Sequence, residues 1–276
     1  MYLKPKKSLG QNFLVDKNIQ RKIIEACSFK PRDIVLEIGA GRGELTRLIA
    51  HQVASLFSLE IDASLYASLH DDLKGCANVK IINGDILKFN LKKFSRRFKK
   101  IKVVGNIPYY ISTPIIECLL GVKEKIDSIF ITVQKEFARR IVAHSGSKDY
   151  GSLSLFIQHH THPKILFNIK RTSFFPSPKV DSSFLRLEIK KARGRDNRVD
   201  EKLLFRLIRS AFNQRRKTLR NSLKDIAATV DLEAFFNQYN INRNIRPEGL
   251  CPADFLNLTN FLKKRQKIVD KHTLLI

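Results

Sequence analysis

The sequence of 276 residues has no Trp, only four Cys and half as many acidic residues as basic ones, 26 Asp+Glu against 51 Lys+Arg. The cysteines stand singly with no CxxC pair, which argues against a disulfide framework or a zinc site. No apolar run approaches the ~20 residues of a membrane span, and the N-terminus has no apolar signal core. Because 43% of the residues are hydrophobic, wholesale disorder is also excluded. We therefore expect a folded cytoplasmic protein with no membrane partner.

The shortage of acidic residues is not uniform along the chain. Residues 33–89 carry eight acidic and five basic residues, whereas 90–105 carry seven basic and no acidic ones, and 190–276 carry twenty basic and nine acidic ones. A formal net charge of +25 predicts a polyanionic partner, with nucleic acid ahead of a membrane surface. The acidic segment predicts a different ligand, a cationic or hydroxyl-rich small molecule.

The hydrophobic pattern from residue 33 onward alternates short apolar runs with amphipathic ones. Strands are expected at 34–38, 54–61, 79–83, 101–105 and 126–133, and helices at 44–51, 63–74, 113–120 and 134–144. This alternation predicts an α/β fold, a doubly wound, Rossmann-like parallel sheet covered on both faces. After a helix at 151–161, strands at 164–169 and 182–189 are expected to form an antiparallel pair at one edge.

The last part of the chain changes in character. Residues 190–198 have few apolar side chains and are typical of a linker, and apolar residues then recur at helical spacing in 203–212, 231–239 and 253–265. We therefore expect two domains, a catalytic domain with a basic N-terminal arm over 1–190 and a small all-helical domain over 191–276.

A glycine-rich loop follows the first expected strand, in Glu37-Ile-Gly39-Ala-Gly41-Arg-Gly43. Its GxGxG spacing differs from the GxGxxG of dinucleotide-binding proteins, and no phosphate-binding GxxxxGK[ST] is present. Glu60 ends the second strand, where a carboxylate can accept both hydroxyls of a ribose. Asp85 follows the third strand and can accept from an adenine amine. A pocket with several carboxylates suits S-adenosylmethionine, a sulfonium cofactor, better than an anionic pyrophosphate. The competing interpretation is a plain turn with solvated carboxylates.

The sequence Asn106-Ile107-Pro108-Tyr109 follows the fourth strand. Pro108 forces Ile107 into an extended conformation, which points the Asn106 amide and the Ile107 carbonyl outward as two acceptors. Two acceptors that hold the N–H groups of an aromatic amine favour a pyramidal nitrogen with its lone pair aimed at a methyl group. Tyr109 offers a face on which the base stacks. The pattern therefore predicts amine methylation, although alone it would indicate an ordinary turn.

Together these motifs resemble the small-subunit (16S) ribosomal RNA adenine dimethyltransferases, a family of class I S-adenosylmethionine-dependent methyltransferases. The resemblance spans nearly the whole chain and includes GQNFL (10–14), VLEIGAGRGELT, LEID, NGDIL, GNIPYYIST, FFPSPKVDS (174–182) and FNQRRKTLRNSL (212–223). It implies that the cofactor is bound by Asn12, Leu14, Glu37, Gly39, Gly41, Glu60, Asp85 and Asn106.

The same resemblance implies a catalytic set of Asn106, Ile107, Pro108, Tyr109 and Phe174, in which Phe174 stacks on the far side of the adenine. It implies dimethylation of two neighbouring adenosines in a hairpin loop near the 3′ end of small-subunit rRNA, a role in ribosome biogenesis, and a partner that is this RNA or an immature small subunit. We expect a monomer. Ile107 and Ser177 stand where many relatives carry Leu and Pro; Ile107 acts through its backbone, so neither change affects the expected chemistry.

Two further groups of residues have competing interpretations. His159, His160 and His162 could suggest a metal, but without Cys or a paired acid at ligand spacing we expect none. Basic runs usually form a solvated face, yet Phe94 and Phe98, one helical turn apart, predict an anchored helix that presents charge to RNA. The RNA-binding candidates are Lys92, Lys93, Arg96, Arg97, Arg215, Arg216, Lys217 and Arg220.

Two alternative functions stay open at this point. One is a large-subunit rRNA adenine methyltransferase of the antibiotic-resistance type, which shares the glycine loop and the NIPY-type site. The other is an RNA-binding ribosome-assembly factor in which catalysis is secondary. The segments FFPSPKVDS and QRRKT favour the small-subunit enzyme, and intact Glu60, Asp85, Asn106 and Tyr109 argue against loss of catalysis.

Overall fold

The computed structural model describes residues 4–191, 199–214 and 216–273, with side chains placed as far as Arg265. By its internal contacts the chain divides into two units, Met1–Ala138 with His160–Lys190 and Arg139–His159 with Lys191–Ile276. The second unit thus contains 139–159 in addition to the stretch that follows residue 190. No helix in the described part of the chain is long and apolar enough to cross a membrane.

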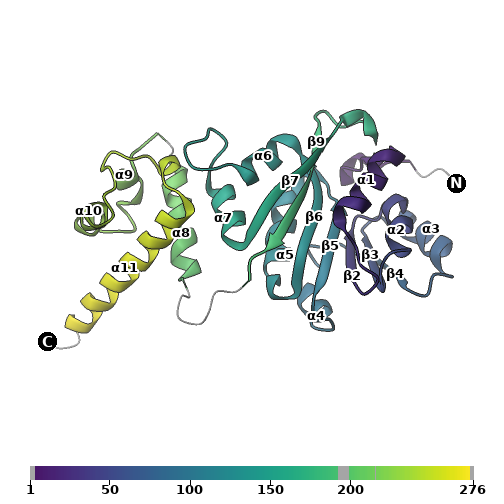
Figure 1. Cartoon of the computed structure of the whole chain (residues 1–276), viewed down its shortest axis with the longest axis horizontal. Helices are drawn as coiled ribbons and strands as arrows, with labels where there is room; N and C mark the ends of the chain where they lie inside the picture. The colour runs from purple at the N-terminus through teal and green to yellow at the C-terminus, as the bar shows by residue number, and fades with distance from the viewer. Residues whose placement is uncertain (1–3, 192–198, 215, 274–276) are drawn as a thin grey trace. The chain divides into compact units, whose positions relative to one another are not determined.

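Within the described residues, the first unit is built on a seven-stranded sheet of order β4-β3-β2-β5-β6-β9-β7 (Figure 1). Strands β2 to β6 run parallel, and β9 is antiparallel to both β6 and β7. The expected parallel sheet with an antiparallel pair at one edge is therefore confirmed. The strands are β2 (Ile34–Ile38), β3 (Ser55–Glu60), β4 (Val79–Asn83), β5 (Ile101–Asn106), β6 (Ile126–Gln134), β7 (Thr161–Ile169) and β9 (Ser182–Ile189).

Helices cover both faces of this sheet, as a doubly wound fold requires. One buried cluster joins Ile23 and Ile49, from two helices, to Val35 and Val104 of the sheet. On the opposite face the ring of Phe57 lies 5.1 Å from that of Phe94. The helices are α1 (Lys17–Cys27), α2 (Glu44–Ala50), α3 (Ala63–Leu73), α4 (Leu91–Ser95), α5 (Ser112–Leu120) and α6 (Lys135–Val142), the last of which runs from the first unit into the second.

The second unit is helical, as expected for the end of the chain. Its core contains buried Leu207, Phe235 and Phe255. The Tyr150 hydroxyl donates to the Leu250 carbonyl at 3.0 Å and its side chain is fully buried in this core, which explains why 139–159 cluster with the later helices. The helices are α7 (Ser152–His160), α8 (Glu201–Asn213), α9 (Leu219–Leu223), α10 (Thr229–Gln238) and α11 (Pro252–Thr273).

A two-stranded ribbon brings distant segments of the first unit together. Strand β1 (Phe13–Leu14) pairs antiparallel with β8 (Phe174–Phe175), with Leu14 opposite Phe174. Asp16 caps helix α1 by accepting from the amides of Asn18 and Ile19, and it also accepts from the Ser173 hydroxyl. The ribbon thereby holds the segment before it, residues 4–12, near the ends of the parallel strands.

Candidate active site

A pocket opens at the carboxyl edge of the parallel strands, where open α/β sheets bind their ligands. It encloses about 770 Å³, part of it open to solvent. Its walls come from the loops that follow β2, β3, β4 and β5 and from residues 9–13. Of the residues that the sequence predicted, the structure brings together Asn12, Gly39, Gly41, Glu60, Asp85, Asn106, Ile107, Pro108 and Tyr109.

The glycine loop approaches the pocket with backbone alone. Gly39 and Gly41 have φ of +76° and +60°, a left-handed region that favours glycine. A Cβ on Gly41 would lie 3.3 Å from the Phe13 ring, so a side chain there would crowd this wall of the pocket. Glycine therefore supplies both the turn and the close approach that a ligand needs.

Glu60 ends β3 with its carboxylate facing the glycine loop. Its Oε2 accepts from the Gly41 amide at 2.8 Å, and its Oε1 accepts from the Asp62 amide at 2.9 Å. Burial raises the pKa of Glu60, and these two backbone donors oppose that effect. Each oxygen keeps further acceptor capacity, as the hydroxyls of a ribose require.

The remaining walls fit the rest of S-adenosylmethionine. Asp85 uses Oδ1 to accept from the Leu87 amide at 2.9 Å, and no described residue donates to its Oδ2. Apolar side chains of Ile61, Ile86 and Ile107 line the same pocket, where an adenine ring could lie between them. A carboxylate for the ribose, an acceptor for the amine and apolar walls for the ring form the donor and acceptor set of this cofactor.

Glu37 is not part of the pocket wall. Its side chain is 2% exposed beneath the glycine loop, where its Oε2 accepts from the hydroxyls of Thr46 and Ser58, both at 2.7 Å. Burial raises the pKa of Glu37 to about 7, against the two hydroxyl donors. In the structure this residue ties β2 to α2 and β3 and supports the loop from below.

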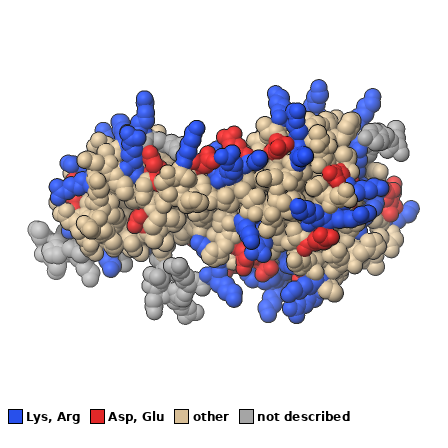
Figure 2. Space-filling model, turned by 45° about the horizontal axis from the view of Figure 1, so that its top comes forward, with Lys and Arg blue, Asp and Glu red and all other residues tan. Residues whose placement is uncertain are grey.

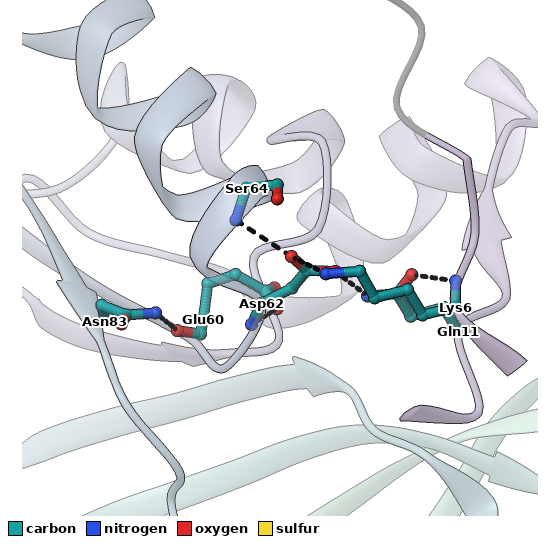
Figure 3. A network of polar contacts seen from close by, with 6 residues as sticks. All are labelled: Lys6, Gln11, Glu60, Asp62, Ser64 and Asn83. Carbon is teal, nitrogen blue, oxygen red and sulfur yellow. Dashed lines mark hydrogen bonds and ion pairs between the residues drawn. The ribbon is translucent and has the colours of Figure 1, made fainter. Parts of the chain in front are cut away.

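An N-terminal strap, residues 6–12, crosses from the pocket to the start of α3 (Figure 3). The Asp62 carboxylate accepts from Lys6 Nζ at 2.8 Å and from Gln11 Nε2 at 3.0 Å, and Gln11 Oε1 accepts from the Lys6 amide. Gln11 and Asp62 were not among the predicted site residues. Only their position inside GQNFL and LEID pointed to them, and no local pattern predicts a contact over 51 residues.

The strap also reaches the NIPY loop. Asn106 Nδ2 donates to the Asn12 carbonyl at 2.9 Å, which fixes the amide with Oδ1 as its remaining acceptor. Neither Asn106 Oδ1 nor the Ile107 carbonyl accepts a hydrogen bond from any residue that the structure describes. Two acceptors without a described donor therefore belong to residues that line the pocket.

Tyr109 stands beside these acceptors. Its hydroxyl lies 2.6 Å from Ser182 Oγ on β9, and burial raises the pKa of the phenol, so the group stays neutral. The hydrogen bond anchors the tip of the ring, while the ring itself lines the pocket. This placement suits a stacking platform.

Leu14 and Phe174 do not line the pocket. Both are 3% exposed and lie in the hydrophobic cluster under α1, opposite each other in the β1–β8 ribbon. A stacking role for Phe174 would require its ring to leave this cluster. The neighbouring Phe175 is 46% exposed.

The predicted RNA-binding residues fall in separate places. Lys92, Lys93, Arg96 and Arg97 are exposed on and after α4, which ends at Ser95, a shorter helix than the Phe94 and Phe98 spacing predicts. In the second unit Arg216 and Lys217 are exposed, Arg220 pairs with Glu233 at 3.1 Å, and Arg215 lies outside the described residues.

Comparison with known proteins gives a consistent result. The family model of ribosomal RNA adenine dimethylases matches residues 2–264. A ribosomal RNA small subunit methyltransferase A from Levilactobacillus brevis is 42% identical over 264 residues, covering 92% of this chain and 89% of that protein. The protein of the same name from Moorella thermoacetica is 43% identical over 229 residues, covering 80% and 79%.

Two solved structures agree with this chain over most of its length. A dimethyladenosine transferase from Plasmodium falciparum is 26% identical with a TM-score of 0.77, covering 92% of this chain and 98% of that one. The 23S rRNA methyltransferase ErmE is also 26% identical, with a TM-score of 0.71 and coverage of 91% and 100%. The chain belongs to the ribosomal RNA adenine dimethylase family and is an S-adenosylmethionine-dependent methyltransferase.

Proposed function

We propose that this enzyme transfers two methyl groups to the exocyclic nitrogen of each of two adjacent adenosines, in a hairpin loop near the 3′ end of small-subunit rRNA, and that it acts in small-subunit biogenesis. The observation that carries this proposal is a pair of acceptors with no described donor, Asn106 Oδ1 and the Ile107 carbonyl, on residues that line the pocket. Relatives named for the small subunit, at 38–43% identity, favour that substrate over the large subunit, whose methyltransferase ErmE is 26% identical.

The chemistry needs positioning more than a strong base. The lone pair of an adenine amine is delocalised into the ring, which makes the nitrogen a poor nucleophile. When Asn106 Oδ1 and the Ile107 carbonyl accept its two N–H groups, the nitrogen becomes pyramidal and its lone pair turns toward the cofactor side. S-adenosylmethionine supplies the electrophilic methyl group when bound. In-line positioning of this kind contributes up to ~7–11 kcal/mol in favourable cases.

The second methyl transfer uses the same acceptors. A monomethylated amine keeps one N–H, so one acceptor still orients it. Each transfer forms an N–CH3 bond as the S–CH3 bond breaks, leaves the demethylated thioether of the cofactor, and gives an acidic alkylated nitrogen that loses its proton to water. Tyr109 stacks on the base, at about 1–3 kcal/mol per base. The resemblance also assigns Phe174 to the far side of the base. In the structure the Phe174 ring is buried in the hydrophobic core, so this role would require the ring to leave the core.

Recognition of the RNA is assigned to the basic segments. In this proposal the first unit binds cofactor and base, and the helical second unit holds the RNA through Arg216 and Lys217, with Arg215 and Arg220 from the same motif. The α4 region adds Lys92, Lys93, Arg96 and Arg97. Lys and Arg at such positions neutralise phosphates and release counterions.

The test is methylation of defined particles. The protein is incubated with methyl-labelled S-adenosylmethionine and either immature small subunits or large-subunit RNA, and the label is mapped to nucleotides. Two dimethylated neighbouring adenosines in small-subunit RNA are expected. Label on large-subunit RNA alone would select the antibiotic-resistance type of enzyme, and tight RNA binding without label would select the assembly factor.

The role of Asn106 has its own test. Asn106→Ala removes one of the two acceptors, so turnover is expected to fall at least 100-fold, a loss of order 3 kcal/mol in transition-state stabilisation. Calorimetric affinity for S-adenosylmethionine should stay within a few-fold of wild type. A variant that loses cofactor affinity instead would show that Asn106 acts mainly on the cofactor.

A further inference from the structure

The amino edge of the sheet, opposite the pocket, carries a concentration of positive charge. Strands β2, β5 and β6 are neighbours and parallel, so the segments that precede them meet at this edge. We define the basic edge as six exposed residues in the segments before β2 and β5: Lys30, Arg32, Arg96, Arg97, Lys99 and Lys100.

Side-chain contacts join these segments into one surface. Lys102 at the start of β5 pairs with Asp33 at 2.8 Å and donates to the Ser28 carbonyl at 3.1 Å, next to β2. On the other side, Lys125 donates to the Phe98 carbonyl at 3.1 Å and Lys100 donates to the Ile126 carbonyl at 3.2 Å. The segments before β2, β5 and β6 are therefore tied together, with the basic edge on their exposed side.

Three of the six charges on this surface have no carboxylate partner among the described residues. Asp33 is already paired with Lys102, and within the described part of the chain no carboxylate lies within 4.0 Å of the charged groups of Arg32, Arg96 or Lys99. Arg97 lies over the rings of Phe57 and Phe98, at 5.8 and 5.4 Å, which holds its guanidinium in place. Figure 2 shows basic side chains crowding the lower margin of the part of the molecule that holds the sheet. Self-repulsion of this kind is relieved by a polyanion.

The basic edge and the pocket lie at opposite ends of the parallel strands. Strand β5 runs from Ile101 at this edge to Asn106 at the pocket. At ~3.3 Å per residue the two edges are about 16 Å apart along the strand. A nucleotide whose base enters the pocket cannot place its own phosphate, or those of its neighbours, on the basic edge.

We propose that the basic edge binds the phosphate backbone of a second rRNA helix, separate from the hairpin that supplies the adenosines. This inference rests on the proposed function and deepens it, because it assigns part of the RNA footprint to structure outside the target hairpin. Exposed Arg and Lys side chains on segments anchored to a sheet bind phosphates without recognising the nucleotide sequence. The site therefore favours large folded RNA over a short substrate.

The experiment compares a short hairpin carrying the target loop with the full-length small-subunit RNA. The variant Arg32→Gln/Lys99→Gln removes two charges that make no ion pair with the described residues. Its control, Lys74→Gln/Lys80→Gln, removes two exposed charges from elsewhere in the first unit. Affinity is measured by filter binding over a salt series, and methylation is measured, on both RNAs and on immature small subunits.

The basic-edge variant should methylate and bind the hairpin within twofold of wild type. On full-length RNA its affinity should fall about tenfold and its salt slope should decrease by about 1 for each lost phosphate contact, while the control stays near wild type. A second variant, Arg32→Lys, should bind like wild type because it keeps the charge.

Three results would overturn the inference. The first is equal affinity of the basic-edge variant and its control for full-length RNA. The second is an equal loss of affinity for the hairpin and for full-length RNA. The third is a loss of affinity seen only with ribosomal particles, which would assign the surface to a protein partner. Failure of the proposed function can be distinguished from failure of this inference. If the proposed function is wrong, the wild-type enzyme itself leaves the small-subunit adenosines unmethylated.

Discussion

Asp62 is the residue on which the N-terminal strap depends. Its side chain is 2% exposed, and it also caps α3 by accepting from the Ser64 amide. Burial acts to raise the pKa of Asp62, but hydrogen bonds from Lys6 and Gln11 outweigh it and lower the pKa below its usual range. The carboxylate is therefore charged at neutral pH and holds the strap against the pocket by charge-assisted hydrogen bonds.

Replacing Asp62 should loosen the strap without unfolding the helix. Asp62→Asn keeps a good N-cap residue but loses the charge that Lys6 and Gln11 bind. The KM for S-adenosylmethionine should rise roughly tenfold, on the order of 1.4 kcal/mol, with kcat within twofold of wild type.

Limited trypsin digestion measures independently whether the strap is held against the pocket. Cofactor should protect the bonds after Lys6 and Lys7 in the wild-type enzyme and protect them less in Asp62→Asn. Lys6→Gln should have a smaller effect on KM, because the Lys6 side chain is 49% exposed. An unchanged KM together with unchanged protection would remove Asp62 from any role beyond capping.

The raised pKa of the buried Glu37 carboxyl predicts that the stability of the protein depends on pH. Its pKa is about 7 in the folded protein against 4.5 for the ordinary group, so the folded state binds this proton more tightly than the unfolded chain does. The free energy of unfolding should therefore fall as pH rises from about 4.5 to about 7, by up to ~3 kcal/mol, and then level off.

Glu37→Gln removes this ionisation and should flatten the pH dependence over that interval. The measurement is urea unfolding followed by circular dichroism at several pH values between 4.5 and 8. The slope is the quantity compared, because Gln also changes the hydrogen bonds with Thr46 and Ser58 and shifts the absolute value. Parallel curves for the two proteins would show that Glu37 does not carry the effect.

At the scale of elements, the β1–β8 ribbon separates two adjacent aromatic side chains into different roles. Phe174 lies in the core and Phe175 is exposed. We expect Phe174→Leu to lower stability by about 1 kcal/mol with little change in KM for RNA. Phe175→Ala should leave Tm unchanged and raise KM for RNA about fivefold if its exposed ring stacks on RNA.

The reciprocal result would restore the role that the family resemblance assigns to Phe174. Loss of turnover in Phe174→Leu at unchanged Tm would mean that its ring leaves the core when RNA binds. Melting curves and steady-state kinetics on the same samples distinguish the two cases.

The sheet was predictable because its strands are short, buried apolar runs at regular intervals. The observed strands β2, β3, β4, β5 and β6 agree with the expected ranges to within one residue at each end. Helix α1 was not predicted, although Asp16 caps it and Ile23, Ile24 and Cys27 form its buried face. Helix α4 ends at Ser95, and the contact of Phe98 with Phe94 and Phe57 is made from the turn that follows.

The pocket was predictable to the extent that its residues follow strand ends. Glu60, Asp85 and Asn106 do so, and parallel strands bring their ends to one edge. The strap was not predictable, since Lys6 and Gln11 reach Asp62 across more than 50 residues. Burial of Glu37 and Phe174 also depends on packing from α1, α2 and β3, which no local pattern specifies.

At the scale of the whole molecule, acidic and basic residues belong to different binding surfaces. The acidic segment 33–89 forms the glycine loop, the end of β3 and the loop of Asp85, all around the pocket. The basic residues of the α4 region, the basic edge and the second unit lie outside this segment. The net charge of +25 is therefore a sum over surfaces with different ligands, and each surface has its own salt dependence.

The second unit provides the clearest whole-molecule test. Arg216 and Lys217 are exposed, whereas Arg220 is held by Glu233, which also pairs with Arg243 at 3.1 Å. Arg216→Gln/Lys217→Gln should weaken binding to small-subunit RNA and reduce the slope of log K against log salt by about 2, one unit for each lost phosphate contact.

Two comparisons make that test specific. The control Lys202→Gln/Lys224→Gln removes two other exposed charges of the same unit and should keep the wild-type slope. Arg220→Gln should change the slope less than Arg216→Gln does, because its guanidinium is already engaged by a carboxylate. Cofactor affinity should be unaffected in all of these variants, since the pocket is lined by residues of the first unit alone. If Arg216→Gln/Lys217→Gln and its control lower the slope equally, the second unit attracts RNA by diffuse charge, and the QRRKT motif has no specific contact with phosphate.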